Sequence, residues 1–302
     1  MSPIILFCED PLSPRKPDMM YETEVKACES LGIQYEVISF EALVHEKRPE
    51  KAVRYVAEQS SAQVGVYRGW MLRPEYYASL FNALLAKGIS LINPPQSYKH
   101  THHLPESYSL IAPLTPETVW TDANKNISID EIMSLLIPFG SSPAIVKDYV
   151  KSQKHYWEEA CFIPSASDRQ AVERVVNRFL ELQGDDLNEG LVFRRFVELE
   201  PLATHSKSGM PLTKEFRIFV LDKHPFYIAE YWEEGDYQNL SLPIDQFRDI
   251  MQLVESRFYT MDVAQKRDGQ WIITELGDAQ VAGLPEKANP HTFYEAIKAV
   301  DA

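Results

Sequence analysis

Residues 261–278 read MDVAQKRDGQWIITELGD and are the most informative part of the chain. Two runs of apolar and β-branched residues flank an Asp-Gly pair, which is a strong signal for a tight β-hairpin. Pairing of the two strands would bring Asp262 close to Glu275, and Asp278 follows just past the second strand. Converging carboxylates repel one another unless a cation neutralises them, and oxygen ligands suit Mg²⁺ with bound phosphates. The hairpin therefore predicts a magnesium site made of Asp262, Glu275 and Asp278; the alternative is a hairpin with exposed acids on its rim.

The composition is that of an ordinary globular protein. The chain has 302 residues, of which 45% are hydrophobic and 25% are charged, enough for two or three packed subdomains. A net charge of -14 argues against nucleic acid or an anionic membrane surface as the main partner. The N-terminus lacks a signal-peptide pattern, no apolar run approaches the roughly 20 residues that cross a bilayer, and the three cysteines form no disulfide or metal motif. We expect a cytoplasmic protein with reduced thiols.

The first third of the chain alternates strands with helices. Strands are expected at 3–8, 34–38, 63–68 and 89–93, and helices at 19–31, 50–59 and 74–87. This alternation predicts an α/β domain with a small parallel sheet covered on both faces. Residues 94–138, rich in proline, histidine and serine, are expected to link or cap this domain.

The rest of the chain mixes antiparallel strands with helices and is expected to be α+β. Strands are expected at 144–147, 190–197, 214–221, 226–231 and in the acidic hairpin, and helices at 168–182, at 245–258 and from 290 onward.

Several charged residues occupy constrained places in this half. Lys147 ends an apolar strand, where its ammonium can reach a phosphate, and Lys151 and Lys154 follow within the next turn. Lysines at a strand end are usually solvated, and we favour that alternative for Lys154. Glu215 and Arg217 share one face of a strand. They either form a surface pair or direct the arginine into a cleft, where it would hold a phosphate or a carboxylate.

A further strand, residues 193–200, can offer backbone groups to a purine and an acid to ribose hydroxyls. In chain order the features are a lysine on a strand, a second lysine, this strand, a Glu-x-Arg strand and the acidic hairpin. That order resembles the ATP-grasp superfamily, and most closely the bacterial and phage clade named for one arginine and two lysines. The resemblance is carried by YRGW at 67–70, VKDYVKS at 146–152, EFR at 215–217 and ELGD at 275–278.

The resemblance covers nearly the whole chain and implies its domain organisation. Residues 1–110 would form the α/β domain that precedes an ATP-grasp fold. Residues 111–302 would form the ATP-grasp fold itself, with a central subdomain at about 111–195 and a C-terminal subdomain at about 196–302. ATP would be held between these two α+β subdomains.

The resemblance also implies roles for the candidate residues. The implied nucleotide-binding residues are Lys147, Lys151, Phe196, Val197, Glu198, Glu200, Glu215 and Arg217. Lys147 and Lys151 would contact phosphates, residues 196–198 would hold adenine, and Glu200 would contact ribose. Arg217 would face the γ-phosphate or the acyl-phosphate intermediate, and Arg217 and Lys151 would act in catalysis. Mg²⁺ would be bound by Asp262, Glu275 and Asp278.

The implied activity is that of an ATP-dependent carboxylate–amine ligase, which forms an amide through an acyl phosphate and releases ADP and phosphate. Its substrate would be a small molecule, an amino acid, a peptide or an acceptor protein. The alternatives are a phosphotransferase that uses the same nucleotide site and a regulatory protein that binds nucleotide without turnover. The second alternative stays open because Gly277 stands where many ATP-grasp enzymes have a metal-binding asparagine. Residues 152–157 also lack the glycines of the usual phosphate flap.

Three residues outside the nucleotide site are candidate substrate contacts. Arg68 follows a strand of the parallel sheet at the edge where ligands bind, so it is either an anchor for a substrate carboxylate or a surface arginine. Residues 99–103 contain three histidines, but no cysteine or further histidine completes a zinc site, and a polar loop is the simpler explanation. In an ATP-grasp protein His102 or His103 could face the acceptor as a base.

Overall fold

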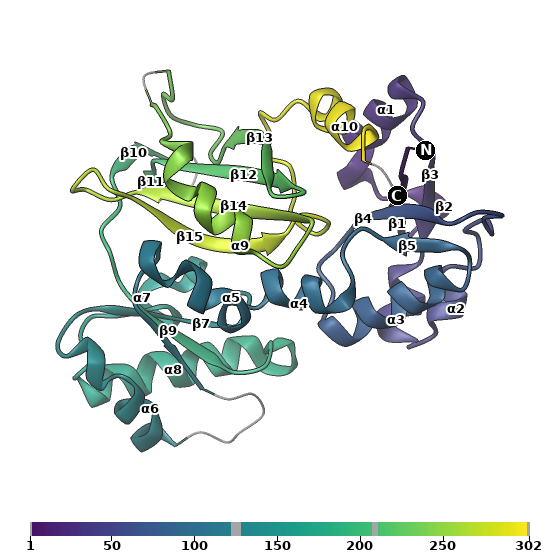
Figure 1. Ribbon diagram of the computed structural model, residues 1–302. Helices are drawn as coiled ribbons and strands as arrows, with labels where there is room; N and C mark the ends of the chain where they lie inside the picture. The colour runs from purple at the N-terminus through teal and green to yellow at the C-terminus, as the bar shows by residue number, and fades with distance from the viewer. Residues whose placement is uncertain (1, 122–127, 207–210, 239, 301–302) are drawn as a thin grey trace.

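The computed structural model describes residues 2–121, 128–206, 211–238 and 240–300. Figure 1 shows an N-terminal domain in purple and blue, a central subdomain mostly in teal, and a C-terminal subdomain in green and yellow. The mixed α/β and α+β architecture expected from the sequence is confirmed. No helix in the described part of the chain is both long and apolar enough to span a membrane.

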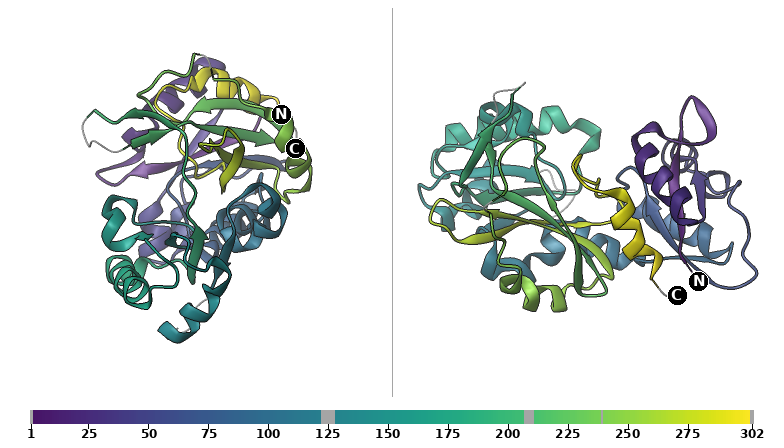
Figure 2. Two further views of the ribbon diagram at one scale, coloured as in Figure 1. Left: turned by 90° about the vertical axis from the view of Figure 1, so that its left-hand side faces the viewer. Right: turned by 90° about the horizontal axis from the view of Figure 1, so that it is seen from above.

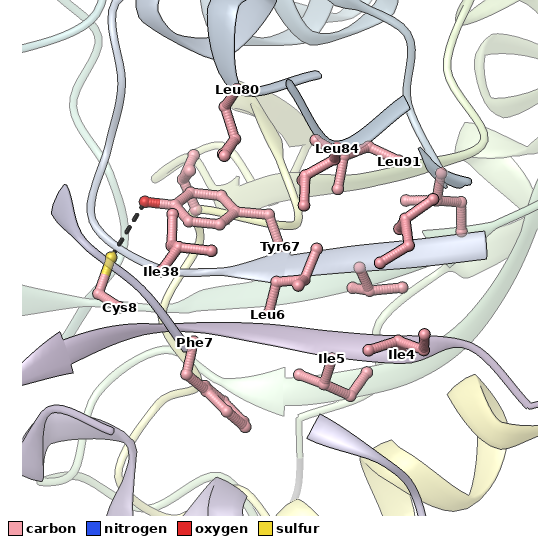
Figure 3. Packing of buried hydrophobic residues seen from close by; sticks show 14 of the residues in the cluster. Ile4, Ile5, Leu6, Phe7, Cys8, Ile38, Tyr67, Leu80, Leu84 and Leu91 are labelled. Carbon is pink, nitrogen blue, oxygen red and sulfur yellow. Dashed lines mark hydrogen bonds between the residues drawn. The ribbon is translucent and has the colours of Figure 1, made fainter. Parts of the chain in front are cut away.

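The N-terminal domain is built on a parallel sheet, as the sequence predicts. Its strands β1 (Ile4–Asp10), β3 (Tyr35–Ile38), β4 (Gln63–Arg68) and β5 (Ile89–Leu91) pair in the order β3-β1-β4-β5, every pair parallel. Leu6 of β1 and Tyr67 of β4 lie on the face of the sheet toward Leu80 and Leu84 of α3 (Pro74–Leu85), and Ile5 and Phe7 point to the opposite face (Figure 3). The sequence does not predict β2 (Ser13–Pro17), antiparallel to the end of β1, because Ser-Pro-Arg-Lys-Pro has little β propensity.

The helices of this domain differ from expectation in one place. η1 (Met19–Tyr21) and α1 (Glu22–Leu31) fill the expected segment, and α1 ends at Gly32, whose φ of 64° is one that glycine adopts readily. A π-helix, η2 (Glu41–His45), precedes α2 (Pro49–Ala52). The helix expected over 50–59 stops at Ala52, because backbone groups of Val56 and Gln59 bond with Lys87 instead.

Residues 94–138 connect the domains through helices rather than an irregular link. The elements are α4 (Pro95–His102), α5 (Leu104–Ile111), η3 (Ala112–Leu114), β6 (Thr118–Trp120), α6 (Ile129–Leu135) and η4 (Ile137–Phe139). Residues 122–127 of this segment lie outside the described residues. Prolines occupy the first turns of α4 and α5. Backbone N–H groups in a first turn have no carbonyl partner within the helix, so the N–H that proline lacks costs no hydrogen bond there. Helix α4 therefore runs between the N-terminal domain and the C-terminal sheet (Figure 1).

The central subdomain is a four-stranded antiparallel sheet covered on one face by helices. Its strands β6, β7 (Ala144–Asp148), β8 (Phe162–Ile163) and β9 (Leu191–Arg195) pair in the order β6-β9-β7-β8. Helices η5 (Lys154–Tyr156), α7 (Trp157–Ala160), α8 (Arg169–Gln183) and η6 (Gly184–Asp186) complete it. The α8 side chains Val172, Val175 and Phe179 pack on the sheet face that carries Val146 and Phe193. The opposite face of the sheet is left for the C-terminal subdomain.

The C-terminal subdomain carries a second antiparallel sheet. Strands β12 (Glu215–Leu221), β13 (His224–Glu230), β14 (Phe258–Gln265) and β15 (Trp271–Asp278) pair in the order β13-β12-β14-β15, beside the small hairpin of β10 (Pro201–Thr204) and β11 (Pro211–Thr213). The helix expected at 245–258 is shorter, η7 (Ile244–Phe247) and α9 (Arg248–Leu253), because Val254 turns extended before β14 begins.

The C-terminal end of the chain returns to the N-terminal domain. Helix α10 (Pro290–Lys298) packs beside α1, and Phe293 and Tyr294 belong to the same core as the parallel sheet. Figure 2 shows this yellow segment leaving the C-terminal subdomain toward the N-terminal domain. The chain after β15 is thus held at both ends, by the C-terminal sheet on one side and by the N-terminal core on the other.

Candidate active site

Charged side chains line up across three neighbouring strands of the C-terminal sheet. Arg217 of β12 lies opposite Asp262 of β14, which lies opposite Glu275 of β15. Directly opposed residues of antiparallel strands project from the same face. The hairpin expected from the sequence therefore brings Asp262 and Glu275 together.

Each of these carboxylates is paired with a positively charged side chain. Arg217 donates from Nε and Nη2 to Asp262 Oδ1 and Oδ2 at 2.8 and 2.7 Å. Lys147, at the end of β7 in the central subdomain, donates from Nζ to Glu275 Oε1 at 2.7 Å. The Lys147 side chain is 8% exposed and that of Glu275 is 42% exposed. A charge-assisted pair thus joins the two subdomains across the interface between their sheets.

The electrostatic environment keeps Glu275 ionised. Burial alone would raise the pKa of this carboxyl, but Lys147, Arg194 and Arg217 lower it below its usual value. Burial opposes the charge of Arg217 as well, yet the carboxylate of Asp262 raises the pKa of its guanidinium. Arg217 also donates from Nη1 to the Gly283 carbonyl at 3.0 Å and lies 5.2 Å from the Tyr231 ring centroid. Glu275 and Arg217 are therefore both charged at neutral pH.

Arg194 is a site residue that sequence reasoning overlooks. It lies on β9 with its side chain 6% exposed, and it donates to the carbonyl of Thr274, the residue before Glu275. Burial lowers the pKa of its guanidinium to about 10, while Glu275 opposes this. A signal was available, because the adjacent residues Arg194 and Arg195 point to opposite faces of the expected strand, so one of them has to face the covered side.

The strand expected over 193–200 ends earlier, at Arg195, and residues 196–200 connect β9 to the C-terminal subdomain. Phe196 donates its N–H to the Pro143 carbonyl at 2.9 Å, and the Glu200 N–H bonds to Gln265 at 2.8 Å. Val197 lies between them, and the Glu198 carbonyl accepts from the N–H of Arg267 at 3.2 Å. This segment therefore runs from the end of β9 to the tip of the β14–β15 hairpin.

Aromatic side chains gather beside this connection. The Trp157 and Phe162 rings stack with centroids 5.4 Å apart, and the Phe196 ring meets Phe162 edge-on at 5.2 Å. Trp157 is 39% exposed, so part of its ring is open to solvent. Such a surface can stack against a flat base.

The two remaining basic candidates follow β7. Lys151 is exposed, and its N–H donates to the carboxylate of the buried Asp148, which fixes the turn. Lys154 reaches across to the C-terminal subdomain, with Nζ 5.9 Å from the Trp232 ring centroid. The indole N–H of Trp232 donates to Glu215 at 3.2 Å. Burial raises the pKa of Glu215, which lies on the same strand face as Arg217.

Comparison with known proteins agrees with this geometry. The model of an ATP-grasp domain family, family 3 of the clade named for one arginine and two lysines, matches residues 138–297, more than half of the chain. The chain belongs to this clade of ATP-grasp domains. No curated protein matches the sequence.

Several solved structures share the fold over nearly the whole chain. PsnB, in a complex with a minimal precursor, Mg and ADP, has a TM-score of 0.55 and 12% identity, covering 97% of this chain and 96% of its own. The macrocyclase MdnC from Microcystis aeruginosa MRC, bound to the precursor peptide MdnA, has a TM-score of 0.56 and 11% identity, with 100% of each chain covered. The D-cycloserine synthetase DcsG has a TM-score of 0.53 and 13% identity, covering 98% of this chain and 100% of its own. At these identities the likeness concerns the fold.

The expectation that Asp278 is a third metal ligand of this ATP-grasp domain is not supported by its position. Asp278 is fully buried and accepts from the Asn93 side chain at 2.6 Å and from the Gln280 N–H at 3.0 Å. Burial raises the pKa of its carboxyl to about 7, while those donors lower it. Strand β15 continues to Asp278, so this residue and Glu275, three positions apart, face opposite sides. Within the described ranges no three His, Cys, Asp or Glu side chains form a group that could hold a metal.

Arg68 is likewise not placed to anchor a substrate. Its side chain is 1% exposed and pairs with Glu24, while Nη1 donates to the Ala279 and Ala282 carbonyls at 2.6 and 2.7 Å. Tyr294 of α10 donates to the same Glu24 at 2.6 Å. This arginine therefore fastens the chain after β15 to the N-terminal domain.

His102 and His103 lie buried where α4 meets α5. Burial, helped by His103, Lys151 and Lys147, lowers the pKa of His102 to about 3. Burial also lowers the pKa of His103 to about 4, and in the described structure neither of its ring nitrogens has a hydrogen-bond partner. Imidazoles with such pKa values are weak bases at neutral pH, so neither suits the role of a general base.

The two facing carboxylates fit a magnesium site of the kind that ATP uses. Mg²⁺ is usually bound through one or two carboxylates together with substrate phosphates and water. Asp262 and Glu275 supply two such carboxylates on one sheet face, with the bases Lys147 and Arg217 beside them. Many ATP-grasp enzymes have a metal-binding asparagine at the position of Gly277. The two carboxylates do not need Asp278 to take the place of that asparagine.

Proposed function

We propose that this protein is an ATP-dependent carboxylate–amine ligase that forms an amide through an acyl phosphate and releases ADP and phosphate. The observation that carries the proposal is the joining of Lys147 and Arg217 to Glu275 and Asp262 at the interface of two ATP-grasp subdomains. Two bases that can hold phosphates and two acids that can hold Mg²⁺ meet there, which is what phosphoryl transfer requires. Membership of this ATP-grasp clade supports the same activity.

The nucleotide would lie between the two sheets. Adenine would contact the backbone of residues 196–198 and the exposed face of Trp157, and Glu200 would bind the ribose hydroxyls. Lys147 and Lys151 would contact the phosphates, and Asp262 and Glu275 would bind Mg²⁺, which would neutralise phosphate charge. Lys147 is bonded to Glu275 in this structure, so it would have to exchange this carboxylate for a phosphate when the nucleotide binds.

The reaction would proceed in two balanced steps. A carboxylate oxygen of one substrate attacks the γ-phosphorus of ATP, the bond to the ADP oxygen breaks, and ADP leaves. An amine then attacks the carbonyl carbon of the acyl phosphate, phosphate leaves with the bonding electrons, and the nitrogen loses a proton. Arg217 would stabilise the negative charge on the transferred phosphoryl group, because its guanidinium lies beside Asp262 and points from the same face. The acyl phosphate has to be shielded from water, and closure of the segment that carries Lys151 and Lys154 would serve this purpose.

The substrate is proposed to be a peptide or an amino acid. PsnB and MdnC, two structural neighbours, are complexed with precursor peptides, and DcsG is a D-cycloserine synthetase. Neither His102 nor His103 is a suitable base, so the amine would enter uncharged or lose its proton to phosphate or water.

A trapping experiment tests the proposed activity. The protein would be incubated with MgATP, hydroxylamine and pools of amino acids and peptides, and ADP and hydroxamates would be measured by mass spectrometry. Formation of ADP with an equal amount of hydroxamate, lost in Lys147→Met, is the expected result. A phosphorylated product without hydroxamate would indicate a phosphotransferase. Tight ATP binding with no product from any pool would indicate a nucleotide-binding protein without turnover, and either outcome would contradict the proposal.

A further inference from the structure

Arg194 differs from the buried Arg68 and the partly buried Arg217 in what it contacts. Arg68 and Arg217 each donate two hydrogen bonds to one carboxylate, that of Glu24 and that of Asp262. Arg194, although 6% exposed, donates to three neutral oxygens within the described ranges. These acceptors are the hydroxyls of Thr115 and Thr118 and the carbonyl of Thr274. Burying a cation without a hydrogen-bonded acid partner is costly, so the buried position of the Arg194 guanidinium calls for an explanation.

The carbonyl that Arg194 holds lies at an irregularity in the sheet. Asp262 pairs with Glu275 and Val263 pairs with Ile273, so Thr274 is an extra residue on β15. Such a β-bulge redirects the side chains next to it. In regular pairing, the residue opposite Asp262 would be Thr274. The bulge therefore places Glu275 opposite Asp262.

The bulge is fixed from two sides. The Thr274 hydroxyl donates to the Asp262 carbonyl at 3.1 Å, which ties the bulge to β14. Arg194 donates from Nη1 to the Thr274 carbonyl, which ties it to β9 of the central subdomain. The Thr115 hydroxyl, which receives Nη2 of Arg194, donates in turn to the Ile273 carbonyl at 2.7 Å. The segment that presents Glu275 is thus attached to both subdomains.

We propose that Arg194 is a positioning residue for the magnesium site: it holds the bulge at Thr274 so that the Glu275 carboxylate faces Asp262, and it supplies positive charge behind that carboxylate. This inference rests on the proposed nucleotide site. It goes further by naming an arginine that would touch neither nucleotide nor metal. Groups that orient a metal ligand from behind typically contribute about 10- to 100-fold to metal affinity.

Arg194→Met and Arg195→Met form a matched pair of variants. Arg195 is the next residue of β9, its partner is Glu117 at 2.7 Å, and it lies on the other face of the strand. ATP binding would be measured by calorimetry over a range of Mg²⁺ concentrations and in EDTA, and thermal unfolding would show that each variant folds. Arg194→Met should raise the Mg²⁺ concentration for half-maximal enhancement of ATP binding at least about tenfold. It should change the affinity for ATP in EDTA less than about threefold. Arg195→Met should leave both quantities unchanged, and Arg194→Lys should recover part of the loss.

An unchanged Mg²⁺ midpoint in folded Arg194→Met would overturn the inference. An equal loss of ATP affinity with and without Mg²⁺ would overturn it as well. That result would mean that Arg194 stabilises the contact between the subdomains and not the metal site in particular. If Arg194→Met does not fold, Arg194→Gln keeps an amide donor without the charge, and an unchanged Mg²⁺ midpoint in that variant would overturn the inference as well. Failure of the wild-type protein to bind MgATP would instead overturn the proposed function, and this inference with it.

Discussion

Replacing Glu275 with glutamine should make ATP bind more tightly when magnesium is absent. The ammonium of Lys147 is held by Glu275 at 2.7 Å, and ATP has to displace that carboxylate to reach the lysine. Glu275→Gln keeps the shape of the side chain, removes the competing charge, and also removes repulsion between this carboxylate and the phosphates. The variant therefore separates the two roles of Glu275, which are to hold the lysine and to hold the metal.

The expected size of the effect follows from the burial of the pair. A hydrogen bond between charged groups contributes about 1.5–3 kcal/mol. Since the Glu275 side chain is 42% exposed, solvent screening reduces this to about 1–2 kcal/mol. That range corresponds to about 5- to 30-fold in affinity. The enhancement by Mg²⁺ should be lost in the same variant, because one of the two proposed metal ligands is neutral.

Calorimetric titration of ATP in EDTA and in saturating Mg²⁺ measures both effects. Glu117→Gln is the matched control, because it removes a carboxylate that pairs with Arg195 at 2.7 Å and is 44% exposed. The control should bind ATP like the wild type in both conditions. Weaker or unchanged binding of ATP by Glu275→Gln in EDTA would refute the idea that Lys147 changes partners.

Three further predictions concern stability. The pKa of Asp278 is raised from 3.8 to about 7 by burial, so its native carboxyl stays protonated where the unfolded one ionises. The free energy of unfolding should therefore fall by up to about 4 kcal/mol as the pH rises from about 4 to 7, and a ¹³C carboxyl titration with a midpoint below 5 would contradict this. Gly277→Asn should destabilise the protein by about 1–3 kcal/mol in urea unfolding, because a Cβ there would lie 2.8 Å from the Thr260 hydroxyl; adding Thr260→Ala should recover most of the loss, and no recovery would contradict the steric cause. Arg68→Met should cost about 3–5 kcal/mol in the same measurement because Glu24 stays buried without its partner, and a cost below about 1 kcal/mol would show that the pair is not needed.

Local patterns in the sequence predict much of the fold. Strand β4 matches the expected 63–68 at both ends, since a run of valine and tyrosine is bounded by serines before it and glycine after it. The β14–β15 hairpin follows from the Asp-Gly turn and the flanking apolar runs, whereas the direct pairing of Asp262 with Glu275 also depends on the bulge at Thr274. The family resemblance adds the arrangement of two subdomains, which no single strand indicates.

The corrections arise where a residue's surroundings come from distant parts of the chain. The sequence places Asp278 past the strand end, but β15 includes it, and strand alternation turns it toward Asn93. Arg68 ends a strand of the parallel sheet as expected, yet α10 and the chain after β15 cover it from more than 200 residues away. The sequence indicates that one of the two adjacent arginines faces inward, but the role of Arg194 depends on a bulge in β15, which leaves no pattern around Arg194.

The most direct test of the account is a crystal structure of the protein with Mg²⁺ and a non-hydrolysable ATP analogue. A metal ion should be bound by oxygens of both Asp262 and Glu275 at about 2.0–2.1 Å. Lys147 should leave Glu275 for a phosphate oxygen, and adenine should lie beside residues 196–198. A nucleotide bound elsewhere, or a Lys147–Glu275 pair that stays intact beneath a bound nucleotide, would contradict it.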